Sequence, residues 1–166
     1  RIAAELGFNI EKDLFKTAEE KVNMLKAISA ERIKKELDKI LVADTKYPGM
    51  TENAHVTGLC LLDKLNVLGL LFPELLNLKG LKQPEKYHEY DAFEHTKEVF
   101  KYSAPDIRLA ALLHDIGKAE SIKLYHNMHF HAELGTKIAL KYLTALKYSN
   151  SEKRETVALI KNHDYD

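Results

Sequence analysis

Apolar residues recur at three- and four-residue intervals along the whole chain, and no stretch alternates apolar and polar residues over the length of a strand. This spacing matches the 3.6-residue turn of an α-helix, so the pattern predicts an all-α protein without a sheet. A short stub at the start reads as the last turns of a helix, and Pro73 suits the first position of a short helix. The longer helices are expected at 11–28, 30–43, 52–69, 91–103, 105–116, 129–148 and 151–163.

Capping residues suggest where several of these helices begin and end. Ser29 and Ser151 can accept a hydrogen bond from the backbone of a first helical turn, and we interpret both as N-caps. Pro105 is expected to open one helix, whereas Gly69 and Gly117 are expected to end helices. The segment 78–90, "LKGLKQPEKYHEY", lacks helical periodicity, so we predict that it forms the longest connection and separates two subdomains.

Composition and charge narrow the class of protein. The 166 residues are 45% hydrophobic, which suffices for one full core or two small helical subdomains. Twenty-five basic residues balance twenty-five acidic ones, so any contact with RNA would need a local basic face. Cys60 is the single cysteine, and neither a membrane-spanning run nor a signal peptide is evident. We expect a cytoplasmic protein without membrane contact, and a piece of a longer chain because the sequence starts without methionine.

Histidines are concentrated in the second half of the chain, where metal ligands would have to converge. Two His-Asp pairs, His114–Asp115 and His163–Asp164, end predicted helices, while His95 lies in the middle of another. Four helices could thus each contribute ligands to one cleft. Imidazole nitrogen and carboxylate oxygen are ligands for first-row transition metals. Six of the eight histidines lie between residues 95 and 163, at positions 95, 114, 126, 129, 131 and 163.

The pair His114–Asp115 ends an apolar stripe, "LAALLHDIGK". Adjacent residues project about 100° apart on a helix, so both can reach one ion only at the helix edge near its C-terminal end. Gly117 leaves room there, and an anchored helix would give the ligands rigid support. The anchoring side chains would be Leu109, Leu112, Leu113 and Ile116.

Each histidine taken alone has an ordinary explanation as well. His114 could cap the C-terminus of its helix, and His163 could be a solvated helix end. His126 and His129 are most simply surface-loop residues, and the leucine-rich helix around His55 resembles plain packing. The combination of these residues therefore favours a metal site more than any one of them does.

In their order along the chain, His95, "HDIGK" from 114, "FHAELG" at 130–135 and "NHD" at 162–164 resemble the HD superfamily of metal-dependent phosphohydrolases. Four further segments narrow this resemblance to the C-terminal part of a bacterial tRNA nucleotidyltransferase, the CCA-adding enzyme of the poly(A) polymerase family. These segments are "RIAAELGFNIEKD" at the start, "ISAERIKKELDKIL" at 28–41, "LGLLFPELLNLKGLKQ" at 68–83 and "YHEYDAFEHT" at 87–96.

The resemblance implies a helical RNA-binding segment followed by an HD-domain helical bundle. Residues 1–47 would be the C-terminal part of the tRNA-binding region, 48–84 connecting helices and 85–166 the HD domain. In the family, a preceding head with magnesium-binding aspartates transfers nucleotides from CTP and ATP to the tRNA 3′ end. We find no counterpart of that head, and we expect that this chain alone does not add nucleotides. A surface that the head would cover could drive formation of a homodimer.

The resemblance also implies a ligand set for one or two divalent ions, which could be manganese, nickel, cobalt, iron, zinc or magnesium. Asp115 would bridge the two ions, and Lys118 would meet a substrate phosphate as a point charge. The first ion would be bound by His95, His114, Asp115 and Asp164, and the second by His131, His163 and Asp115.

Three hypotheses for the function follow from these expectations. The first is metal-dependent hydrolysis of 2′,3′-cyclic phosphates, 2′-nucleotides or phosphate at a damaged tRNA 3′ end, which would support CCA addition or repair. The alternative is a non-catalytic module that positions tRNA and keeps the HD fold as structure; a regulatory nucleotide-binding domain is a third hypothesis. The alternative rests on four basic residues, Arg32, Lys34, Lys35 and Lys39.

Overall fold

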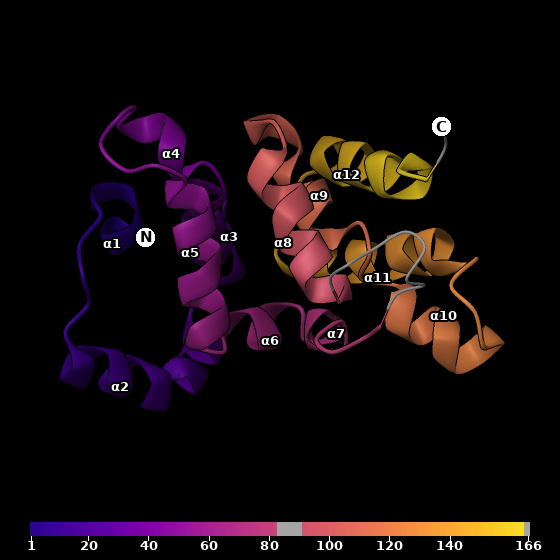
Figure 1. Ribbon diagram of the computed structural model, residues 1–166, viewed down its shortest axis with the longest axis horizontal. Helices are drawn as coiled ribbons and strands as arrows, with labels where there is room; N and C mark the ends of the chain where they lie inside the picture. The colour runs from indigo at the N-terminus through magenta and orange to yellow at the C-terminus, as the bar shows by residue number, and fades with distance from the viewer. Residues whose placement is uncertain (83–90, 165–166) are drawn as a thin grey trace. The chain divides into compact units, whose positions relative to one another are not determined.

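The computed structural model describes residues 1–82 and 91–164. Within these ranges the chain forms twelve α-helices and two short 3-10 helices, and no strand (Figure 1). The all-α prediction is confirmed. The chain divides into two compact units, Arg1–Leu71 and Phe72–Asp166. No helix among the described residues is both long and apolar enough to cross a membrane.

The first unit is organised around one central helix, α5, which packs against α1, α3, α4 and α6. Its buried side chains include Ala4, Leu37 and Leu59, which come from three different helices. The helices of this unit are α1 (Ile2–Leu6), α2 (Lys12–Glu20), η1 (Val22–Ala27), α3 (Ala30–Leu41), α4 (Ala43–Lys46), α5 (Ala54–Lys64) and α6 (Val67–Leu71).

Two long helices predicted for the first unit are interrupted. The predicted helix 11–28 is an α-helix only to Glu20 and continues as the 3-10 helix η1. The predicted helix 52–69 breaks at Asn66, which has a φ of 58°, so Gly69 lies inside α6 and does not end a helix. A positive φ is uncommon in residues other than glycine, but asparagine tolerates it. The spacing of the apolar residues continues across Asn66, so it did not reveal the break.

In contrast, the predicted start of α3 is confirmed. The Ser29 side chain accepts a hydrogen bond from the Arg32 backbone N–H at 3.4 Å, as an N-cap does. Gly7 follows α1 with a φ of 70°, the left-handed conformation that glycine adopts without strain.

The second unit contains the helices that carry the clustered histidines. Helix α11 packs against α10 and α12, and α9 packs against α8 and α12. Phe100, Leu112, Ile116, Leu143 and Ile160 are fully buried in its core. The helices are α7 (Pro73–Leu76), α8 (Ala92–Tyr102), η2 (Pro105–Ile107), α9 (Arg108–Leu113), α10 (Lys118–Tyr125), α11 (His131–Ala145) and α12 (Asn150–Asn162).

Two predictions for this unit were wrong. Gly117 does not end a helix in the left-handed conformation; its φ is −85°, and α10, which we did not predict, begins directly after it. The N-cap of α12 is Ser149 and not Ser151. Ser149 and Glu152 form a capping box, in which each side chain accepts a hydrogen bond from the other residue's backbone N–H.

The connection predicted at 78–90 lies partly outside the described residues, which end at 82 and resume at 91. The compact units divide earlier, between Leu71 and Phe72, so that α7 packs with the second unit. The division into functional regions at 47 and 84 stays a prediction.

Candidate metal centre

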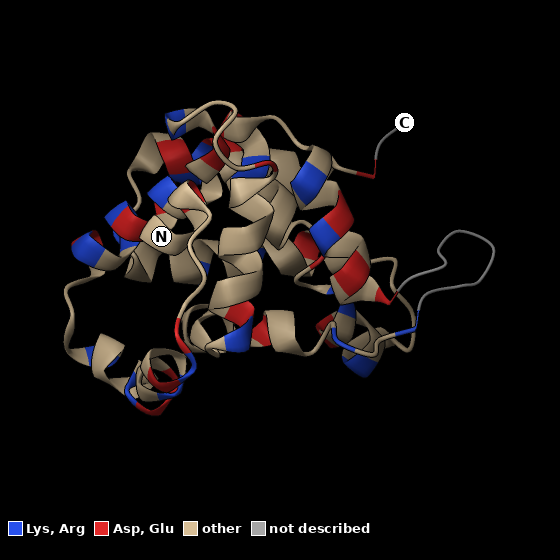
Figure 2. Cartoon of the chain, turned by 60° about the vertical axis from the view of Figure 1, so that its left-hand side comes forward, with Lys and Arg blue, Asp and Glu red and all other residues tan. Residues whose placement is uncertain are grey.

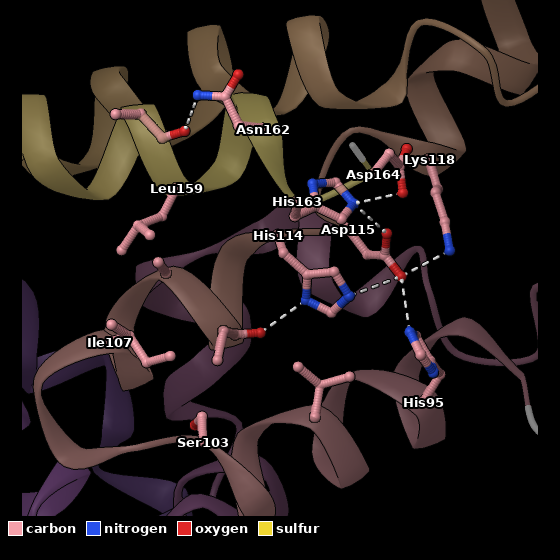
Figure 3. A pocket seen from close by; sticks show the side chains of 14 residues that line it. His95, Ser103, Ile107, His114, Asp115, Lys118, Leu159, Asn162, His163 and Asp164 are labelled. Carbon is pink, nitrogen blue, oxygen red and sulfur yellow. Dashed lines mark hydrogen bonds and ion pairs between the residues drawn. The ribbon is translucent and has the colours of Figure 1, made fainter. Parts of the chain in front are cut away.

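His114 and Asp115 lie in the turn between α9 and α10, and this turn is buried. His114 is 6% exposed and Asp115 only 1%. Leu112, Leu113 and Ile116 are fully buried on either side of the pair, as predicted, while Leu109 is half-buried. The core therefore holds the pair rigidly at one end of a cavity (Figure 3).

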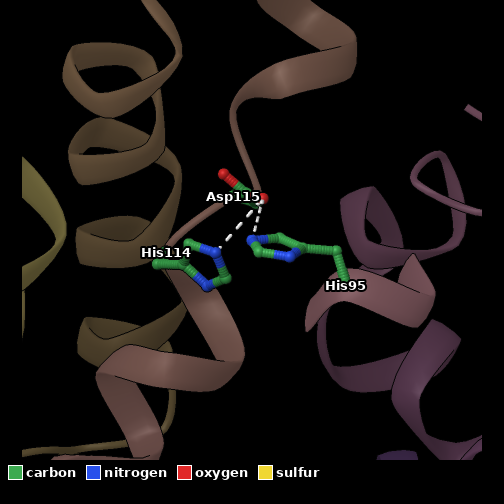
Figure 4. A group of neighbouring side chains, drawn as sticks. All are labelled: His95, His114 and Asp115. Atoms are coloured by element: carbon green, nitrogen blue, oxygen red, sulfur yellow. Dashed lines mark ion pairs between the residues drawn. The ribbon is translucent and has the colours of Figure 1, made fainter. Parts of the chain in front are cut away.

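His95, on α8, lies next to this pair and completes one group of possible metal ligands. The Nε2 atom of His114 is 3.1 Å from the Oδ2 atom of Asp115, and the Nε2 atom of His95 is 3.8 Å from the same oxygen. Figure 4 shows both rings directed at the carboxylate. Ligand atoms from the three residues lie within 4.8 Å of one another, close enough to bind one ion.

His131 and His163 form a second group around the other oxygen of the same carboxylate. His131 begins α11 and His163 follows the last residue of α12. Their Nε2 atoms are 3.4 Å and 3.6 Å from the Oδ1 atom of Asp115. Asp115 thus belongs to both groups and offers one oxygen to each, which is the arrangement of a bridging carboxylate.

Asp164 lies beside the second group. Its Oδ2 atom is 3.2 Å from the Nε2 atom of His131, and its Oδ1 atom is 3.3 Å from that of His163. This carboxylate is 59% exposed, so it faces the solvent side of the centre. Its assignment to the first ion, together with His95 and His114, stays a prediction.

The backbone fixes the orientation of the rings of His114, His131 and His163. The Nδ1 atom of each contacts a carbonyl oxygen three residues earlier in the chain. Because a carbonyl oxygen only accepts, Nδ1 must carry the hydrogen, and in the neutral ring Nε2 then presents its lone pair. The contacts are His114 Nδ1 to Ala111 O at 2.8 Å, His131 Nδ1 to Met128 O at 2.6 Å and His163 Nδ1 to Ile160 O at 2.6 Å.

These lone pairs point at one another and at the carboxylate. The Nε2 atoms of His131 and His163 are 3.0 Å apart, and the Nε2 atom of His114 and the Oδ1 atom of Asp115 are buried without a hydrogen bond in the described part of the chain. Such acceptors repel unless a proton or a cation lies between them. The residues therefore fit a divalent ion, and their mixed nitrogen and oxygen set suits a first-row transition metal.

The electrostatics of the centre keep Asp115 and His131 in the form that binds metal. Burial raises the pKa of the Asp115 carboxyl, but His114, His163 and Lys118 outweigh burial and hold that pKa well below its usual range. Burial lowers the pKa of His131, which favours its neutral form. Burial also lowers the pKa of His163, but Asp115 and Asp164 raise it more, so a proton competes with metal at this ring.

Lys118 is the first residue of α10, and its side chain turns back to the centre. Its Nζ atom donates a hydrogen bond to the Oδ2 atom of Asp115 at 2.7 Å, and the side chain is only 8% exposed. The ammonium group thus borders the first ligand group. Its role toward a substrate phosphate stays a prediction.

Gly117 explains how the turn reaches α11. A Cβ atom on Gly117 would overlap the carbonyl oxygen of His131 and lie 2.5 Å from the backbone nitrogen of Gly135. The turn and the first turns of α11 therefore pack backbone to backbone, which brings His131 to Asp115. Sequence reasoning missed this role, although two glycines in "HDIGK" and "FHAELG" offered a signal.

The remaining histidines that the structure describes do not join the centre. His126 and His129 are exposed, as their interpretation as loop residues predicted. His55 is buried in the first unit, where its Nδ1 atom lies 3.3 Å from Asp44. His88 lies outside the described residues.

The four basic residues predicted to meet RNA all lie on α3, in the first unit. Arg32 and Lys35 are exposed. Lys34 pairs with Asp38 at 2.6 Å and Lys39 with Glu36 at 3.0 Å. In Figure 2 basic and acidic residues are interspersed along the helices in view. The helix thus presents a mixed charge and not a uniformly basic face.

Comparison with protein-family models matches both units. Residues 92–166 match the HD domain, and this range contains every predicted metal ligand. Residues 7–78 match the family described as the probable RNA and SrmB-binding site of polymerase A, and this range contains the four basic residues of α3. The chain therefore joins an RNA-binding segment of the polymerase A type to an HD domain of the metal-dependent phosphohydrolase family, a combination consistent with the tRNA nucleotidyltransferase/poly(A) polymerase family.

Proposed function

We propose that the second unit hydrolyses phosphoesters with the help of one or two divalent ions, and that the first unit holds RNA, specifically tRNA. The observation that carries this proposal is the surroundings of Asp115. A buried, ionised carboxylate is shared by two groups of imidazoles, and the rings with fixed orientation aim their lone pairs inward. Such a donor set serves a bound cation better than it serves the stability of the fold.

In this function the protein's own residues divide the work. His95, His114, Asp115 and Asp164 would hold one ion, and Asp115, His131 and His163 the other. A divalent ion in such a centre lowers the pKa of water toward neutrality and offsets negative charge on phosphoryl oxygens. Lys118 orients Asp115 through its hydrogen bond and adds positive charge where a phosphate would lie.

The substrates we propose are 2′,3′-cyclic phosphates, 2′-nucleotides and terminal phosphates of damaged tRNA. The activity would then be that of a 2′,3′-cyclic phosphodiesterase, a 2′-nucleotidase or a phosphatase. Hydrolysis of one ester bond opens a 2′,3′-cyclic phosphate to a phosphate monoester. Hydrolysis of the monoester then releases inorganic phosphate and leaves the free hydroxyl groups that nucleotide addition at a tRNA 3′ end requires. The match to an RNA-binding segment in the same chain supports a role next to RNA ends.

The test combines metal analysis with an activity assay. We would measure the metal content of the purified chain, and then hydrolysis of 2′,3′-cyclic AMP with manganese, nickel, cobalt or magnesium. The double variant His114→Ala, Asp115→Ala should bind no metal and lose turnover. His129→Ala is the matched control, because His129 is exposed and lies outside both ligand groups.

Turnover that requires metal and survives only in the control would support the phosphohydrolase. Turnover that persists in the double variant would contradict it. Bound metal without turnover on any phosphoester would favour the second candidate, a module that positions tRNA and uses its HD fold as structure.

That second candidate rests on the match of residues 7–78 to an RNA-binding family. Binding of tRNA should weaken as salt rises, because lysine and arginine contacts release counterions from phosphate. Arg32→Ala and Lys35→Ala should each reduce the slope of the logarithm of the tRNA association constant against the logarithm of the salt concentration by about one. Lys34→Ala and Lys39→Ala should do less, since these lysines already pair with acidic residues on α3. Binding that salt does not affect would contradict this role.

A further inference from the structure

The cavity next to the metal centre has two chemically different ends. Its volume is about 580 Å³, which falls within the range of small-molecule sites. The charged side chains of Asp115 and Lys118 lie at one end. Ile107 and Leu159 lie at the other, as Figure 3 shows. Val99 also lines the cavity, so much of its wall is apolar.

Two polar side chains in the wall each donate a hydrogen bond to a nearby backbone carbonyl. Ser103 donates its hydroxyl hydrogen to the carbonyl oxygen of Phe100 at 2.8 Å. Asn162 donates from Nδ2 to the carbonyl oxygen of Ala158, also at 2.8 Å. A ligand at this end would therefore meet mainly hydrocarbon.

Two large apolar side chains remain accessible at this end, although burial would stabilise them. Ile107 is 38% exposed and Leu159 is 44% exposed, and both line the same cavity. Exposed apolar residues are ordinary when scattered, but a pair that faces a cavity with charged groups at its far end suggests a ligand with the complementary polarity. Such a ligand carries an anionic group and an uncharged, flat or apolar part.

We propose that the apolar end is the base subsite of a nucleotide whose phosphate lies at the metal centre, and that Leu159 and Ile107 hold the base by apolar contact. The phosphate assignment rests on the proposed function, whereas the polarity of the cavity does not. Because few hydrogen-bonding groups face this end, the subsite favours a phosphate ligand that carries a base over one that lacks it. The same scarcity of hydrogen-bonding groups gives little discrimination between one base and another. Leu159 and Ile107 thus determine the specificity for nucleotides over sugar phosphates that lack a base.

The experiment measures equilibrium binding by calorimetry with three probes: 2′-AMP, ribose 2-phosphate and inorganic phosphate. The titrations are run in the cold, and released phosphate is assayed afterwards to confirm that no probe was hydrolysed. Wild-type protein should bind 2′-AMP at least about tenfold more tightly than ribose 2-phosphate, since the base buries apolar surface. Leu159→Ser should reduce this preference about fivefold, because it removes part of the apolar wall. Leu140→Ser is the matched control: Leu140 is a 45% exposed leucine on α11 that does not line the cavity, and the preference should not change.

The outcomes separate this proposal from the proposed function, because hydrolysis of 2′,3′-cyclic AMP is measured on the same samples. A base preference that Leu159→Ser weakens supports the subsite even if no hydrolysis occurs. Hydrolysis combined with equal affinity for 2′-AMP and ribose 2-phosphate overturns the subsite alone. A preference that Leu159→Ser and Leu140→Ser leave equally intact also overturns it. Discrimination of more than about a hundredfold between 2′-AMP and 2′-CMP would overturn recognition by apolar contact.

Discussion

Among the residues that the structure describes, each unit buries one carboxylate almost completely, and the two carboxylates have different surroundings. Glu5, in the first unit, is 3% exposed and is paired with two cations: Arg1 at 2.8 Å and Lys46 at 3.3 Å. Asp115, in the second unit, is 1% exposed and has Lys118 at 2.7 Å, but the other side chains directed at its oxygens are imidazoles.

The difference separates a structural charge from a binding site. The cations beside Glu5 offset its negative charge, and they outweigh burial in holding its pKa below the ordinary value. Around Asp115, the imidazoles with fixed orientation direct the lone pairs of their Nε2 atoms at the carboxylate oxygens, which are also hydrogen-bond acceptors. This arrangement contributes little to the stability of the fold unless a cation lies between these atoms. A buried carboxylate thus indicates a metal site when most of its neighbours are metal ligands, and a structural charge when all of them are cations.

The largest effect should come from removing one charge in each unit. Asp115→Asn should weaken metal binding by at least about 100-fold, because it removes the ligand that both groups share. Glu5→Gln should leave metal binding unchanged but lower the free energy of unfolding by about 1–3 kcal/mol, since Arg1 and Lys46 lose their partner. Calorimetric metal titration and urea unfolding of both variants check this. Equal effects on metal binding would abolish the distinction between the two carboxylates.

The packing of glycines should differ between the units as well. Gly117→Ala places a methyl group against the backbone of α11 and should cost about 2–4 kcal/mol of unfolding free energy. Gly58→Ala, in the first unit, meets the side chain of Ile40 at 2.6 Å, which can shift, so its cost should be smaller. Gly135→Ala makes only contacts of 3.5 Å or more and is the control. Thermal unfolding of the three variants tests this order, and a Gly117→Ala protein as stable as wild type would contradict it.

Asp91 couples the start of α8 to pH. Burial raises the pKa of its carboxyl, but hydrogen bonds from the backbone N–H groups of Glu94, Gly80 and Phe93 outweigh burial and hold that pKa below its ordinary value. The ionised Asp91 side chain, which is the N-cap of α8, therefore stabilises the fold at pH values above the ordinary aspartate pKa. This stabilisation is lost as the pH falls through the lowered pKa of Asp91. Asp91→Ala should cost about 1 kcal/mol at pH 7.

The measurement for Asp91 is urea unfolding from pH 7 down to pH 3. The difference in stability between wild type and Asp91→Ala should shrink below about pH 4. A difference that stays constant over this range would show that the carboxylate charge does not stabilise α8.

The smallest effect concerns the two serine caps. Ser149→Ala breaks a reciprocal capping box in the second unit and should cost about 1 kcal/mol. Ser29→Ala, in the first unit, removes a single hydrogen bond of 3.4 Å and should cost less. Ser151→Ala should have almost no effect, because its hydroxyl bonds only the exposed side chain of Glu155. Chemical denaturation of the three variants gives this order, and a costly Ser151→Ala would reverse our assignment of the cap.

Helical periodicity was sufficient to predict most of the helices, because an apolar stripe indicates which face of a helix is buried. It did not show where a predicted helix is interrupted. Asn66 adopts a left-handed conformation inside an unbroken apolar pattern, and α10 begins directly after a glycine that we interpreted as a helix end. Local sequence could not reveal that Gly117 serves a tertiary contact with α11, because the partner lies at Gly135.

The resemblance implied the residues of the candidate site and two ligand groups that share Asp115, but the contacts between these residues were not predicted. The sequence indicated which residues to consider because histidines and aspartates recur near helix ends. It could not show that Asp115 presents a different oxygen to each group, or that the carboxylate of Asp164 lies against His131 and His163. Those relations depend on how α8, α11 and α12 pack around one turn.

The carbonyl groups that orient His114, His131 and His163 belong to the peptide backbone three residues upstream. Any amino acid at those upstream positions supplies the same carbonyl oxygen, so the residue types at these positions do not indicate the contacts. A scan of side-chain substitutions would pass over them. Replacing the Met128 peptide bond by an ester, which weakens its carbonyl as an acceptor, would expose their contribution at a single atom.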